Sequence, residues 1–164
     1  MTIKDNFQKI LRALVPATQN LYGERLTALV VFGSVGRNTP RPDSDIDLLF
    51  VVKDLPSGRL RRMDEFTQLE RSLGPLLEEL KKQGIETTLS PVIKTPDEIR
   101  KGSPLFMDMM EDGVILFEKD SFFSDYLRDF STRLHNLGAR RLRRGESWYW
   151  LLDQNHSIDE VIIQ

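Results

Sequence analysis

The sequence predicts an α/β fold of the α+β kind, with a mixed β-sheet of about four to five strands and helices packed on it. Two apolar runs, Leu26 to Phe32 and Ile46 to Val52, have the length and composition of buried strands. Apolar residues at helical spacing mark long helices on both sides of these strands. A helix placed between two strands is the crossover that parallel neighbours in a sheet require.

The first half of the chain contains two helices whose regularity proline interrupts. Residues 5–15 form an amphipathic helix that Pro16 breaks or kinks, and a further turn of helix can follow before Gly23. Residues 61–84 form the crossover, which Gly74 and Pro75 divide into two helices or one kinked helix. The segment Ile85 to Ile93 then forms the third strand, which begins immediately after Gly84.

The second half alternates short elements with one long helix. Pro96 opens a short helix, 105–111 form another, and 114–117 form a fourth strand. Met107, Met109 and Met110 are expected to fill the core. A broad aromatic stripe runs along a helix from Phe122 to about Gly138 and is expected to pack on the sheet, with a dimer or partner surface as the alternative.

Composition sets limits on the class of protein. The 164 residues fit one domain, and 40% hydrophobic with 29% charged residues is ordinary for a water-soluble globule. A net charge of −2 gives no general attraction to nucleic acid or anionic membranes, and the absence of cysteine excludes disulfides and thiolate metal sites. No apolar run is long enough for a membrane span, and residues 1–6 do not resemble a signal peptide, so we expect a cytoplasmic protein.

Two carboxylates open the second strand, and a small-residue turn closes the first. Asp45 and Asp47 are two residues apart, so on a strand they project from the same face. Adjacent carboxylates repel unless a cation neutralises them, and Mg²⁺ prefers oxygen ligands. Gly33 and Ser34 form a turn whose backbone N–H groups can hold a phosphate, with the hydroxyl as a further donor. The stretch therefore predicts a site for a nucleoside triphosphate and its metal.

These residues resemble the signature of the DNA polymerase β-like nucleotidyltransferase superfamily. Gly33 and Ser34, ten intervening residues and then Asp45-Ile46-Asp47, with Ser44 before the acids and an apolar strand after them, match it in order and spacing. The likeness is greatest to the minimal nucleotidyltransferase (MNT) branch, whose members include antitoxins. It implies a nucleotidyltransferase domain over 1–120, with residues 121–164 a C-terminal helix and short strand extension packed on the same domain.

The resemblance also assigns roles to individual residues. It places Asp45 and Asp47 on Mg²⁺, and Gly33, Ser34, Arg37 and Ser44 at the ATP. For Arg37 the alternative is an ordinary exposed arginine with no part in the site. The superfamily supplies a third carboxylate from the third strand as metal ligand and general base, and Glu86 is the acidic residue there. Thr88 is one pleat further along the same face; if that position faces the metals, the base is missing.

The reaction that the resemblance implies is transfer of AMP from ATP to an acceptor hydroxyl with release of pyrophosphate. In the MNT branch the acceptor is a tyrosine of a helical toxin of the HEPN class. One alternative is a catalytically silent protein that neutralises its partner by occlusion. Another is a nucleotidyltransferase that acts on small molecules or RNA ends, in which case the arginines and aromatics of Arg140–Trp150 would bind the RNA. The structural alternative for Arg140–Trp150 is a helix end followed by a final strand, with 158–163 as a possible further strand.

Overall fold

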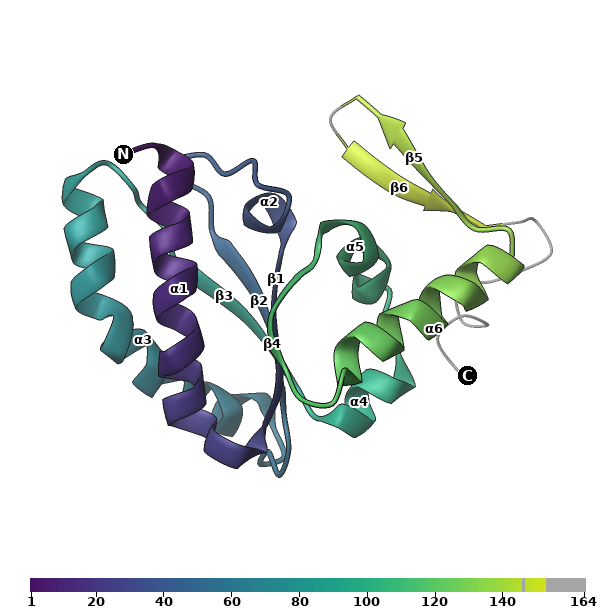
Figure 1. The fold of residues 1–164 in the computed structure, drawn as a ribbon, viewed down its shortest axis with the longest axis horizontal. Helices are drawn as coiled ribbons and strands as arrows, with labels where there is room; N and C mark the ends of the chain where they lie inside the picture. The colour runs from purple at the N-terminus through teal and green to yellow at the C-terminus, as the bar shows by residue number, and fades with distance from the viewer. Residues whose placement is uncertain (146, 153–164) are drawn as a thin grey trace.

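The computed structural model describes residues 1–145 and 147–152, and places a four-stranded sheet between two layers of helices (Figure 1). The strand order is β3-β2-β1-β4. β1 is antiparallel to both of its neighbours, whereas β2 and β3 run parallel. The strands are β1 (Leu26–Phe32), β2 (Ile46–Val52), β3 (Leu89–Lys94) and β4 (Val114–Glu118). The mixed sheet with packed helices confirms the predicted fold class.

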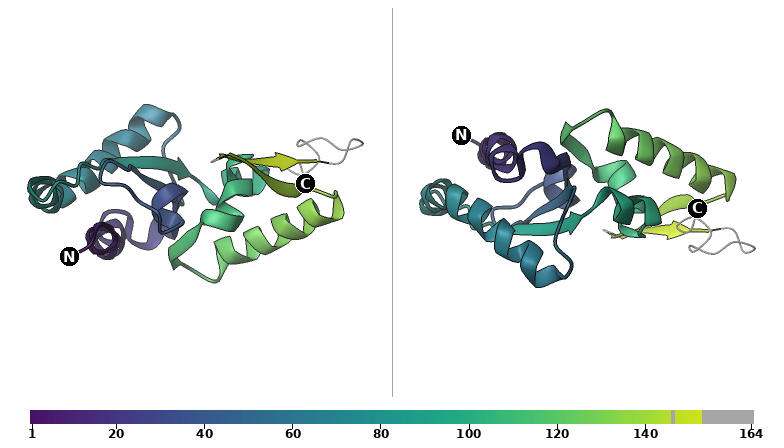
Figure 2. Two further views of the ribbon diagram at one scale, coloured as in Figure 1. Left: turned by 90° about the horizontal axis from the view of Figure 1, so that it is seen from above. Right: turned by 90° about the horizontal axis from the view of Figure 1, so that it is seen from below.

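Helices cover both faces of this sheet, as the views from above and below show (Figure 2). One layer consists of α1 (Ile3–Tyr22) and α3 (Arg59–Lys82). The other consists of α4 (Pro96–Lys101), α5 (Leu105–Asp112) and α6 (Phe122–Asn136). Two short elements flank β1: a 3₁₀ turn, η1 (Gly23–Arg25), and α2 (Gly33–Gly36).

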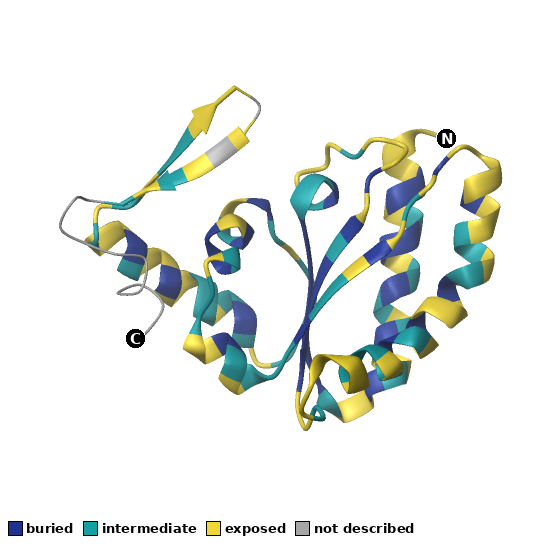
Figure 3. Cartoon of the chain, turned by 180° about the vertical axis from the view of Figure 1, so that it is seen from behind, coloured by how far each residue is buried: buried dark blue, intermediate teal, exposed yellow. Residues whose placement is uncertain are grey.

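The continuous apolar runs of β1 and β2 follow from this layered arrangement. Alternate residues of the central strands point into two separate cores, so almost every position must be apolar (Figure 3). In the first core, Phe50 contacts the rings of Tyr22 and Phe66. In the second, Phe106 of α5 contacts three aromatic rings of α6, those of Phe123, Tyr126 and Phe130. Phe123 and Phe130 of the predicted aromatic stripe are buried, as are Met107 and Met109, whereas Phe122, Tyr126 and Met110 are half-buried.

Both proline-containing segments form single helices. α1 continues through Pro16 to Tyr22, and α3 continues through Gly74 and Pro75 to Lys82. α3 changes direction along its length (Figure 1), as expected where a proline removes a backbone hydrogen bond. A break is observed at neither proline; in both segments the alternative of a helix that continues beyond the proline holds.

The third strand begins later than predicted. Residues 85–88 do not belong to β3, because they cross from the end of α3 to the sheet. Two of their backbone groups bond outside the sheet: the N–H of Ile85 donates to the carbonyl of Leu80, and the N–H of Glu86 donates to that of Pro42. The parallel register with β2 starts only at Leu89, opposite Ile46. This shift moves Glu86 off the strand.

A two-stranded ribbon follows α6 and projects from the body of the protein (Figure 1). β5 (Arg140–Arg144) and β6 (Ser147–Leu151) are antiparallel, with Arg141 opposite Trp150. The predicted strand at 148–150 is therefore present, but the arginines form its partner strand and not a helix end. The further strand predicted at 158–163 lies outside the described residues. Over the described ranges, the helices do not include one long and apolar enough to cross a membrane.

Candidate active site

Asp45 and Asp47 lie at the start of β2, at the edge of the sheet where β1 ends. Asp45 directly precedes the strand and is exposed, whereas Asp47 is its second residue and is half-buried beside Phe32 of β1. Burial raises the pKa of the Asp47 carboxyl, and the negative charge of Asp45 raises it further. A hydrogen bond with Ser90 and the charge of Arg37 act in the opposite direction. The two acids therefore interact, as a cation-binding pair requires.

Gly33 is packed directly against the Asp47 carboxylate. Its φ of +66° is in the left-handed region, and a Cβ atom at this position would overlap Oδ2 of Asp47 and lie 3.2 Å from its Cγ. Glycine is the residue that both adopts this φ without strain and leaves room for the Asp47 carboxylate. Because α2 begins at Gly33, a left-handed residue is followed by helical ones, which turns successive N–H groups toward a common point suited to an anion.

The polar loop between α2 and β2 is held by its own hydrogen bonds. The carbonyl of Ser34 accepts from the backbone N–H and the hydroxyl of Thr39, at 2.9 and 3.4 Å. Ser44 is buried, and its hydroxyl accepts from the N–H of Arg41 at 2.8 Å. Ser44 thus shapes the loop before the acids, while the half-exposed Ser34 lies in the turn that starts at Gly33.

The position on β3 beside Asp47 carries a hydroxyl group. Ser90 is the register partner of Asp47, and the Thr88 hydroxyl donates to Oδ1 of Asp45 at 2.8 Å. Glu86 is exposed, ahead of the strand. Within residues 1–145 and 147–152, no three His, Cys, Asp or Glu side chains are grouped to hold a metal ion. The structure brings Asp45 and Asp47 together with two hydroxyl residues, and it does not bring Glu86 into the group.

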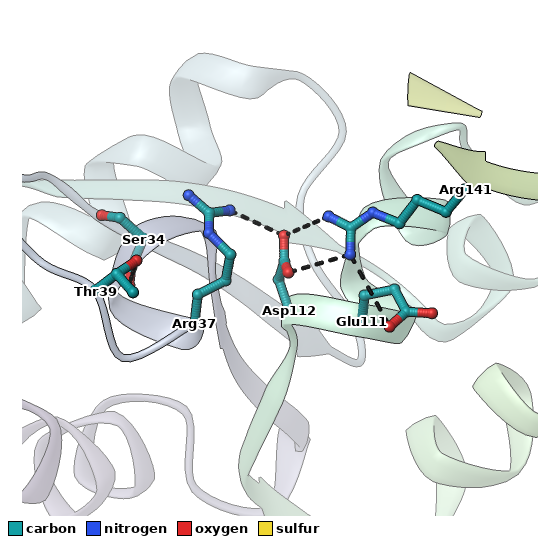
Figure 4. A network of polar contacts seen from close by, with 6 residues as sticks. All are labelled: Ser34, Arg37, Thr39, Glu111, Asp112 and Arg141. Atoms are coloured by element: carbon teal, nitrogen blue, oxygen red, sulfur yellow. Dashed lines mark hydrogen bonds and ion pairs between the residues drawn. The ribbon is translucent and has the colours of Figure 1, made fainter. Parts of the chain in front are cut away.

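A buried ion network adjoins the turn and was not predicted (Figure 4). The Asp112 carboxylate at the end of α5 is 8% exposed and accepts from Nη1 of Arg37 at 2.9 Å. On its other side, Nη2 of Arg141 donates to Oδ2 at 3.2 Å and Nη1 donates to Oδ1 at 3.4 Å. The three residues come from distant parts of the sequence. The only sequence signal was the presence of arginines at 37 and 141.

These groups surround one cavity of about 420 Å³. Its lining includes Gly33 and Asp47 on the sheet side, and Arg37, Asp112 and Arg141 on the other. Leu105 and Asp108 of α5 and Ser147 of β6 complete it, together with Phe32. The volume is within the range of small-ligand sites. Asp47 of the acid pair, the first residue of the turn and two arginines therefore meet around one space.

Comparison with known proteins identifies the family of the chain. The sequence pattern of the nucleotidyltransferase domain matches residues 11–120, which include α2, the acid pair and Asp112. The chain belongs to the nucleotidyltransferase domain family. The match ends before α6, so the β5–β6 ribbon with Arg141 lies beyond the part of this nucleotidyltransferase that the family pattern covers.

The chain is also similar to a named relative in sequence and to chains of two solved structures. The nucleotidyltransferase is 28% identical, over 120 residues, to a Methanocaldococcus jannaschii protein named "Putative protein adenylyltransferase MJ1305"; the match covers 72% of this chain and 76% of the relative. A structure of the tri-AMPylated HEPN toxin of Shewanella oneidensis in complex with an MNT antitoxin contains a chain that is 15% identical, with a TM-score of 0.48 and coverage of 80% and 90% of the two chains. A toxin–antitoxin structure with AMP-PNP gives 16% identity, a TM-score of 0.42 and coverage of 84% and 94%.

Proposed function

We propose that this nucleotidyltransferase moves AMP from ATP onto a hydroxyl group of a partner protein and releases pyrophosphate. The observation that carries this proposal is the acid pair of Asp45 and Asp47 packed against the Gly33 turn inside the family domain. The relative named as a protein adenylyltransferase, which the chain matches over most of both lengths, supports a protein acceptor.

The donor set suits Mg²⁺, because only oxygen ligands are offered and two carboxylates with substrate phosphates are a common way to hold this ion. Asp45 and Asp47 would hold the metal, which supplies charge neutralisation at the transferred phosphoryl group. The partial burial of Asp47 and its repulsion by the charge of Asp45 fit a site built around a cation. The hydroxyl of Thr88 orients Asp45.

The Gly33 turn and Arg37 would bind the triphosphate. Gly33, Arg37 and Asp47 line the same cavity, so a phosphate chain bound at the turn and its metal would be adjacent. Arg37 is 40% exposed on its side chain and can donate to phosphate while it contacts Asp112. Glu86 does not reach this arrangement as a third ligand, so we assign the catalysis to positioning and charge neutralisation.

For the acceptor we propose a tyrosine of a HEPN-type toxin, on the basis of the sequence signature shared with the MNT branch. We expect a gene beside that of this protein to encode the toxin, and ATP to be the nucleotide. Because β3 offers hydroxyl groups in place of a carboxylate beside Asp47, occlusion of the toxin without turnover is the second candidate.

Incubation of the protein and its co-expressed partner with ATP labelled at the α-phosphate tests the proposal. Label on a partner tyrosine, dependent on Mg²⁺ and absent with Asp45→Asn, is the expected result. A stable complex that carries no label would refute transfer and support occlusion. Asp43→Asn is the matched control, because Asp43 lies in the same loop and is exposed beside Arg41.

A further inference from the structure

The β5–β6 ribbon is joined to the nucleotide-binding turn through one buried carboxylate. Asp112 receives Arg37 from the end of α2 and Arg141 from β5 (Figure 4). The Arg141 side chain is only 13% exposed, in contrast to Arg140, Arg143 and Arg144 on the same strand, which are exposed. Arg141 therefore points into the protein, where it lines the cavity.

The position of Asp112 is fixed by tight backbone packing. Its carbonyl lies so close to Gly36 that a Cβ atom there would overlap it and would also lie 3.1 Å from the carbonyl of Val31. The end of α5 is thus held against the end of α2. A carboxylate at the C-terminal end of a helix is opposed by the helix dipole, so cationic partners are needed to keep it buried and charged. Arg37 and Arg141 supply the positive charges, and their bonds to Asp112 orient both guanidinium groups.

The charges around the cavity select the kind of ligand. Arg37 and Arg141 provide two positive charges, whereas Asp47, Asp108 and Asp112 provide three negative ones. A bare anion is repelled by the acids, and a bare cation is repelled by the guanidinium groups. A polyphosphate that carries its own divalent cation matches both, with the metal toward Asp47 and the phosphates toward the arginines.

We propose that Arg141 is a second polyphosphate-binding arginine of this site, that Asp112 is the positioning residue for both arginines, and that the C-terminal ribbon thereby completes the nucleotide site. The inference rests on the proposed function, since it gives the triphosphate of ATP a further contact. It assigns binding to a residue outside the segment that the family pattern matches.

Titration calorimetry with Mg·tripolyphosphate and with AMP tests this subsite directly. Arg141→Gln should weaken Mg·tripolyphosphate about tenfold or more, since one charge-assisted hydrogen bond is lost, and should leave AMP affinity within about twofold. Arg141→Lys, which keeps the charge but not the fork of donors, should give an intermediate loss. Arg144→Gln is the matched control on the same strand and should bind like wild type.

A second variant protects the test from a folding defect. If Arg141→Gln loses structure by circular dichroism, Arg141→Gln combined with Asp112→Asn removes the unpaired buried charge and should restore the fold without restoring polyphosphate binding. Wild-type affinity in any folded variant that lacks Arg141 overturns the subsite, as does a wild-type protein that does not bind Mg·tripolyphosphate. Polyphosphate binding that depends on Arg141, without transfer of AMP to a partner, refutes the proposed function and leaves the subsite standing.

Discussion

Replacing Gly33 with alanine separates the backbone requirement at the nucleotide turn from the requirement for space beside Asp47. A left-handed residue other than glycine costs about 1–2 kcal/mol. Gly84 also has a left-handed φ, +87°, but a Cβ atom there would meet nothing within 4 Å. Gly84→Ala therefore carries the backbone cost alone. At Gly33 the added methyl group would also displace the end of the Asp47 side chain, which can rotate away at little cost in folding energy.

We expect both variants to lose about 1–2 kcal/mol in urea unfolding, or roughly 2–8 °C in melting temperature. Only Gly33→Ala should lose Mg·ATP affinity and AMP transfer, because only there does a ligand carboxylate have to move. Calorimetry with Mg·ATP at a temperature where both variants are folded measures the difference. Wild-type affinity in Gly33→Ala, or an equal loss in Gly84→Ala, would refute the link between this glycine and the acid pair.

Three further changes test other parts of the structure. Asp45→Asn and Asp47→Asn should each abolish transfer while the free energy of unfolding changes by less than about 1 kcal/mol, since Asp45 is exposed and Asp47 is half-buried at the cavity, outside both cores; unfolding of either variant would make them structural. Ser90→Asp places a carboxylate beside Asp47 and should strengthen Mg²⁺ binding in calorimetry, with weaker binding as the contrary result. The bidentate bond with Arg62 lowers the pKa of Glu98 from 4.5 to about 2, so its stabilising contribution is complete above pH 4.5 and is lost as the pH falls toward 2. In urea unfolding, Glu98→Gln should be less stable than wild type by roughly 1–2 kcal/mol at pH 7, after allowance for partial exposure of the pair, and the gap should close toward pH 2; a gap independent of pH would contradict this.

The parts of the site that were predictable from the sequence are local in the chain. The Gly33 turn and the acid pair of Asp45 and Asp47 belong to one strand–turn–strand unit, in which alternation on a strand determines which residues share a face. Burial of β1 on both faces was readable in the same way, since a strand with one face in water would alternate apolar and polar residues.

The parts that were not predictable depend on register and on contacts distant in sequence. Whether Glu86 or Ser90 lies beside Asp47 depends on the residue at which β3 begins to pair with β2. The backbone N–H of Glu86 bonds to Pro42, ahead of the paired strand, and the pattern of apolar and polar residues gives no sign of this bond. Asp112 meets Arg37 across 75 residues and Arg141 across 29. No spacing rule connects them, because tertiary packing alone brings them together.

The ribbon of β5 and β6 has a consequence for the behaviour of the protein in solution. Among the described residues these strands pair only with each other, so each leaves one outer edge whose backbone groups could recruit a strand from another molecule. The exposed arginines of β5, Arg140, Arg143 and Arg144, oppose such growth by mutual repulsion between copies. Neutralising them would favour aggregation, and the same positive charge makes the ribbon a surface on which an acidic protein could be retained.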